Sequence, residues 1–91
     1  MKEKYITNSK IVFRKEEDGA LLYNLETGEI KILNEVGAFI FELCDGKHDK
    51  EEIINEIIKN FEIDKNTAEK DFDIFIKEME KENLILRKEL D

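Results

Sequence analysis

The hydrophobic pattern of this chain changes its period at Asn34, and this change limits the possible folds more than any other feature. Before Asn34, apolar residues gather in short β-favouring runs that are separated by turn residues. After it, apolar residues recur every three or four positions, as they do on one face of a helix. No proline interrupts either half. The order of the two patterns predicts an α+β fold in which the strands come first and the helices follow.

The strand half reads as a three-stranded antiparallel β-meander. Residues 11–15, 20–24 and 29–33 are the expected strands, and the turns between them contain Gly19 and Gly28. Asp-Gly is a strong hairpin signal, and Gly28 suits a turn position with positive φ. In the third strand, Ile30 and Ile32 are expected on the face opposite Lys31, because side chains alternate along a strand.

Asn34 is the expected N-cap of the first helix. Gly46 lies just beyond its predicted end, and its apolar stripe is Val36, Phe39, Ile40, Leu43 and Cys44. Gly37 stands inside this helix at a cost of about 1 kcal/mol relative to Ala. We therefore expect another stretch of backbone to pack closely against it.

Two more helices follow. The second begins at Asp49, with Glu52 completing a capping box, and is expected to bury Ile53, Ile54, Ile57, Ile58 and Phe61. The third is capped by Asp64 or Asn66, and its apolar stripe is Ala68, Phe72, Phe75, Ile76 and Met79. Asn83 suits a left-handed C-terminal cap, after which residues 84–86 are expected to be extended.

Composition sets the class of protein. The 91 residues carry 15 Lys and Arg against 23 Asp and Glu, a net charge of −8. This length is typical of one domain, residues 1–91. Apolar runs reach only four residues, as at 38–41, and the charged first residues hold no signal segment, so we expect a cytoplasmic protein without a membrane anchor. The acidic balance disfavours nucleic acid and anionic lipid as partners.

The chain offers little for catalysis. Cys44 is the only thiol and His48 the only imidazole. We expect Cys44 to be an ordinary buried residue and His48 to lie in the loop after the first helix. The four glycines are about nine residues apart and form no phosphate-binding loop. We therefore predict no catalytic residue, no metal site and no cofactor.

Three strands and three helices in this order suggest a winged-helix-like domain, and such domains commonly bind DNA through the last helix. Residues 67–82, however, include six acidic residues and three lysines, so their net charge is 3 − 6 = −3. A recognition helix lies against phosphates, so this helix would be repelled.

An alternative ligand is an extended peptide. One flank of the third strand stays unpaired in a meander, and a free strand edge can pair with another chain. On the third helix, Ile74 lies away from the core stripe, near Asp71, Phe75 and Glu78. Ile74 is either one wall of a peptide site or an isolated apolar surface residue, and both interpretations are open at this point.

Three segments of the chain resemble the signature of the PqqD-like family, also known as the RiPP precursor peptide recognition element. They are LYNLETG at 22–28, LNEVGA at 33–38 and IFELCDG at 40–46. The resemblance continues through 52–53, 71–72, 75–76, Met79 and 83–85, and covers about residues 10–86. Phe41 stands where the family often has Trp, and Asn83 where it often has Gly.

The resemblance implies a non-enzymatic domain that binds the leader segment of a ribosomally made precursor peptide. It further implies that the leader adds as a strand to the third strand, and that a modifying enzyme, often a radical SAM enzyme, is the second partner. The implied peptide-binding residues are Glu29, Ile30, Lys31, Ile32 and Leu33 on the strand and Asp71, Ile74, Phe75 and Glu78 on the third helix. We expect Asp71 and Glu78 to favour leaders with Lys or Arg. The alternatives are a role in pyrroloquinoline quinone biosynthesis, or an acidic winged-helix regulator that binds protein or DNA.

Overall fold

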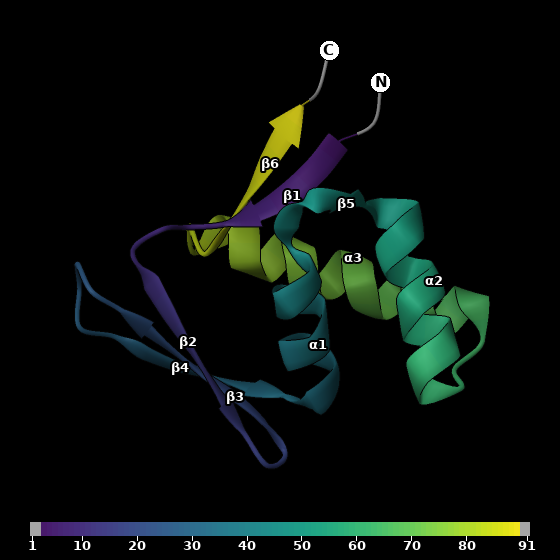
Figure 1. Cartoon of the computed structure of the whole chain (residues 1–91), viewed down its shortest axis with the longest axis horizontal. Coiled ribbons are helices and arrows are strands. Elements are labelled where there is room, and N and C mark those ends of the chain that lie inside the picture. The colour runs from purple at the N-terminus through teal and green to yellow at the C-terminus, as the bar shows by residue number, and fades with distance from the viewer. Residues whose placement is uncertain (1–2, 90–91) are drawn as a thin grey trace.

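A computed structural model describes residues 3–89 of the chain. Its first sheet is the expected meander, in the order β2-β3-β4 (Figure 1). Strand β2 spans Ile11–Glu16, β3 spans Gly19–Asn24 and β4 spans Ile30–Asn34. Both pairs are antiparallel. The predicted turns at Gly19 and Gly28 are confirmed, and Gly28 has φ +79°.

A second sheet, in the order β5-β1-β6, was not predicted. Strand β1 spans Glu3–Thr7, β5 spans Asp45–Asp49 and β6 spans Ile85–Glu89. The extended segment expected at 84–86 is therefore the start of a strand that pairs antiparallel with β1. The expectation that His48 lies in a loop was wrong, because His48 belongs to β5. Its Nδ1 atom lies 2.9 Å from an Asp45 carboxylate oxygen.

The three helices start at the predicted capping residues. Helix α1 spans Glu35–Leu43, α2 spans Lys50–Phe61 and α3 spans Lys65–Lys81. Asn34 caps α1, Asp49 and Glu52 form the capping box of α2, and Asp64 caps α3. Asn83 takes the expected left-handed conformation, with φ +62°.

Helix α1 lies between the two sheets, and α2 lies beside it on the side away from the first sheet (Figure 1). The core combines residues from both sheets and all three helices, and its largest fully buried side chains include Phe72, Leu22, Ile40, Ile53 and Met79. Of the predicted stripe on α3, only Phe75 is not fully buried. The winged-helix-like α+β architecture is confirmed, and the second sheet is an addition to it.

Candidate functional site

Strand β4 is an outer strand of its sheet, so one of its edges pairs with no strand among residues 3–89. The sheet's other outer strand, β2, ends in three exposed charged residues at 14–16. Charged side chains are a common protection of strand edges against pairing. Strand β4 instead carries Ile30 and Ile32, which are 63% and 78% exposed. Of the two outer strands, β4 is therefore the better template for an added strand.

A groove of about 340 Å³ separates β4 from α3. The β4 side contributes Lys31, Ile32 and Leu33, and the α3 side contributes Asp71, Ile74, Phe75 and Glu78. These are seven of the nine residues that the resemblance implied, and the fold brings them together around one groove. Ile74 is 58% exposed, as expected for a residue off the core stripe.

Helix α1 supplies the rest of the lining, which sequence reasoning missed. Val36, Gly37 and Ile40 line the groove, together with the capping residue Asn34. The apolar period predicts that Val36 and Ile40 lie on the core stripe of their helix. The apolar period of α1 was predicted correctly, but periodicity alone does not show that the stripe also borders a groove.

The ring of Phe75 explains why a glycine stands at position 37. A Cβ atom on Gly37 would lie 3.0 Å from Cε1 of the Phe75 ring and 3.2 Å from the Asn34 side-chain oxygen. The expected close approach is confirmed, but the expectation that a backbone makes it was wrong. The Gly37 hydrogen atom therefore leaves room for an aromatic ring that is half-buried in the groove wall.

Lys31 bridges strand and helix inside the groove. Its Nζ atom lies 2.8 Å from a Glu78 carboxylate oxygen and 3.1 Å from one of Glu82. The hydrogen bond to Glu78 raises the pKa of Lys31, so the ammonium stays charged well above neutral pH. Glu78 therefore already has a cation, whereas Asp71, the other carboxylate of the predicted pair, has no ion pair within residues 3–89.

A second groove of about 430 Å³ lies on the other side of Lys31. Glu29, Ile30 and Lys31 line it from β4 and the turn before it, and Leu22, Asn24, Glu82 and Leu84 complete it. The remaining two implied residues, Glu29 and Ile30, thus belong to this second groove. The two grooves follow β4 end to end and share Lys31.

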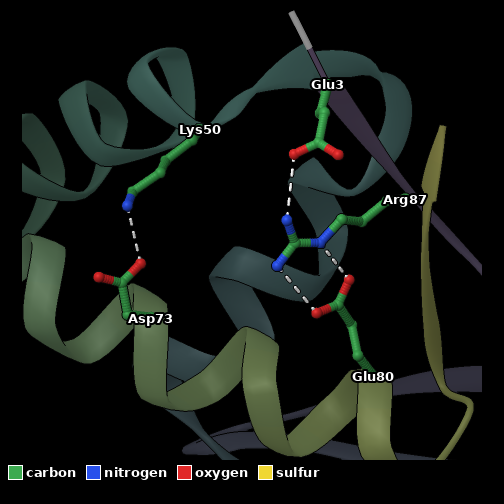
Figure 2. Close-up of polar contacts among 5 residues, drawn as sticks. All are labelled: Glu3, Lys50, Asp73, Glu80 and Arg87. Atoms are coloured by element: carbon green, nitrogen blue, oxygen red, sulfur yellow. Dashed lines mark hydrogen bonds and ion pairs between the residues drawn. The ribbon is translucent and has the colours of Figure 1, made fainter. Parts of the chain in front are cut away.

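The opposite face of α3 borders a hollow of about 910 Å³, larger than either groove. Figure 2 shows how its charges pair: Arg87 of β6 donates hydrogen bonds to Glu80 and Glu3, and Lys50 of α2 pairs with Asp73. The hydrogen bonds that Arg87 donates to Glu80 raise the pKa of Arg87 above its usual value. These contacts fasten α3 to the second sheet and to α2, which indicates a structural role for this face.

Reactive side chains are sparse around the grooves. Cys44 is buried, and burial is the main cause that raises its pKa to about 12. A thiol with such a pKa is a poor nucleophile at neutral pH. Within residues 3–89, no three His, Cys, Asp or Glu side chains are grouped as a metal site. No helix in the same range is long and apolar enough to cross a membrane.

Comparison with known families connects this geometry to a group of proteins. Residues 19–85 match the family model described as coenzyme PQQ synthesis protein D (PqqD). The match includes β3, β4, all three helices and the turn into β6. The chain belongs to the PqqD family. A search of curated proteins found no match for it.

Two solved structures share the fold of this PqqD-family protein. The first is TbiB1 in complex with the TbiA(beta) leader peptide, at 26% identity and a TM-score of 0.80, covering 94% of this chain and 99% of that one. The second is lasso peptide synthetase B1 complexed with the leader peptide, at 18% identity and a TM-score of 0.79, covering 91% and 98%. Because it is so distant in sequence, the second structure supports the fold alone.

Proposed function

We propose that this PqqD-family protein binds the leader segment of a ribosomally made precursor peptide as a strand added to β4. The observation that carries the proposal is the free edge of β4 beside a groove walled by α3. A similar chain, TbiB1, was solved with a leader peptide bound. Both the chain's fold and its family are consistent with a peptide-binding role.

Strand addition explains how a small domain can hold a flexible peptide. Main-chain hydrogen bonds to β4 would supply affinity with little demand on sequence, and pockets beside the strand would choose alternate side chains. Leu33, Ile74 and Phe75 offer an apolar surface for one such side chain. The other leader side chains, which alternate with those in the pockets, would point to the outer face of the sheet, beside Ile30 and Ile32.

The partner in this proposal is an enzyme that modifies the rest of the precursor, such as a radical SAM enzyme. By holding the leader, the domain would raise the effective concentration of the core peptide at the enzyme. The domain itself would supply no catalytic group, since its only thiol is buried and its pKa is raised.

An amide-shift titration tests the proposal. ¹⁵N-labelled protein would be titrated with the short peptides encoded beside its gene. Saturable shifts concentrated at residues 30–34 and on the groove face of α3 are expected. Shifts centred on β2 or on the second sheet, or no saturable shift with any of these peptides, would overturn the proposal. Salt-sensitive binding to duplex DNA would favour the regulator instead.

A second candidate comes from the description of the family model, which refers to coenzyme PQQ synthesis. The peptide would then be the precursor of that quinone, held at the same groove. The two candidates differ only in the peptide that binds, so the same titration separates them when both kinds of precursor are compared.

A further inference from the structure

An ion bridge separates the two grooves that run along β4. Lys31 reaches across from β4 to Glu78 and Glu82 of the α3 end, and its side chain is only 26% exposed. The groove of about 340 Å³ lies on the Leu33 side of this bridge, and the groove of about 430 Å³ lies on the Glu29 side. An added strand would pass over both.

The two halves differ in chemistry. The half beside Leu33, here called the apolar subsite, is lined mainly by Leu33, Val36, Ile40, Ile74 and Phe75, with Asp71 and Glu78 on its α3 wall. The half beside Glu29, here called the acidic subsite, also holds two carboxylates, those of Glu29 and Glu82, but its buried apolar lining consists of Leu22 and Leu84. Glu82 shares the Lys31 ammonium with Glu78, whereas the Glu29 carboxylate accepts a hydrogen bond from the Thr27 hydroxyl at 3.3 Å and from no other group among residues 3–89.

The charge balance favours a basic ligand group in the acidic subsite. The Lys31 ammonium forms ion pairs with both Glu78 and Glu82. The Glu29 carboxylate has no cation partner among residues 3–89. An incoming Lys or Arg would supply the missing charge, and an incoming Asp or Glu would be repelled. The basic preference expected at Glu78 is therefore weakened, because Lys31 already neutralises it, whereas Asp71 on the α3 wall and Glu29 beside β4 each lack a cation partner among residues 3–89. Of these two, Glu29 adjoins β4 and so fixes a position along the added strand.

Strand geometry sets the spacing between the two ligand side chains. Lys31 and Leu33 of β4 line the first groove, and Lys31 lines the second together with Glu29, which directly precedes the strand. Glu29 and Leu33 are four residues apart, roughly 13 Å at the spacing of a strand. A paired strand presents every second side chain to the same side. The residues beside Leu33 and beside Glu29 are therefore also four apart in the peptide.

Resting on the proposed function, we infer that the leader carries an apolar side chain followed four residues later by Lys or Arg. The order assumes that the added strand runs antiparallel to β4, as every other neighbour in this sheet does. The residue midway between the two lies over the Lys31 bridge. The leader's register is thereby set by one apolar contact and one ionic contact.

A random peptide library displayed on phage and selected against the wild-type protein tests this inference. Selected peptides that shift β4 amides are expected to show the apolar-x-x-x-basic pattern. In a labelled selected peptide, replacing the basic residue by Glu is expected to weaken binding about fivefold, as measured by fluorescence anisotropy. The Glu29→Lys variant should remove or invert this preference. The matched variant Glu17→Lys, in the β2–β3 turn outside both grooves, should keep it.

The outcomes separate the inference from the function beneath it. Peptides that bind at β4 without the pattern, or with the basic residue on the other side of the apolar one, would overturn the inference and leave the proposed function standing. If Glu17→Lys also loses the preference for a basic residue, that preference is an effect of net charge alone, and this result would also overturn the inference. Selection of peptides that never shift β4 amides would count against the proposed function itself.

Discussion

Truncation of Ile74 to Ala tests the groove wall with little effect on the fold. Ile74 is 58% exposed on α3, so its loss should change the free energy of unfolding by less than about 0.5 kcal/mol. Ala is also the better helix former, which offsets part of any loss.

The effect on binding follows from the area that a peptide would cover. Full burial of an Ile side chain contributes about 1.5–3 kcal/mol, and more than half of this side chain is still exposed in the free protein. If a peptide covers the exposed part of Ile74, the binding free energy that Ile contributes beyond Ala is about 1 kcal/mol. The Ile74→Ala variant should therefore bind a selected peptide about fivefold more weakly.

Fluorescence anisotropy with a labelled selected peptide measures the change, and urea unfolding measures stability. Leu86→Ala is the matched control, because Leu86 is 45% exposed and lies on β6 of the other sheet. Its peptide affinity should equal that of the wild type. Unchanged affinity in Ile74→Ala, or an equal loss in both variants, would refute the placement of the groove.

Four further outcomes are expected. Gly37→Ala should push the Phe75 ring into the groove and weaken peptide binding severalfold, and the double variant Gly37→Ala/Phe75→Leu should recover much of the loss, as anisotropy would show. Arg87→Ala should lower the free energy of unfolding by about 1 kcal/mol in urea titrations at low salt, and by less at high salt, while peptide affinity stays unchanged. Cys44 should resist iodoacetamide at pH 8 until urea unfolds the chain, because burial raises its pKa to about 12; rapid labelling of the native protein would contradict this. Asp49→Ala should cost about 1–2 kcal/mol of stability through loss of the α2 capping box, without weakening the peptide complex.

The meander and the helices could be predicted because their signals are local. Asp-Gly and Thr-Gly turns lie between alternating runs, and each helix begins at a capping residue whose side chain accepts a backbone N–H. The family resemblance then correctly implied a third strand beside a third helix. The exposure of Ile74 could be predicted because Ile74 departs from an otherwise regular apolar stripe.

The second sheet could not be predicted because it depends on distant partners. Tyr5 pairs with Arg87 across almost the whole chain, and β5 has the sequence DGKHD, which contains no β-favouring residue. Tertiary context alone makes that segment a strand. The Lys31 bridge was missed for the same reason, since residues 31, 78 and 82 meet only in the fold.

Gly37 shows an intermediate case. A glycine inside a helix signals that something packs closely, and this much was correct. The identity of the neighbour, the ring of Phe75 on α3, depended on how two helices cross, which the local sequence does not encode.

The central claim is that a leader peptide adds as a strand to β4, and nuclear Overhauser contacts in the complex test it most directly. We expect cross-strand contacts between backbone protons of the bound peptide and those of residues 30–34, together with side-chain contacts to Ile74 and Phe75. Cross-strand contacts to β2 instead, or side-chain contacts without any backbone pairing, would contradict it.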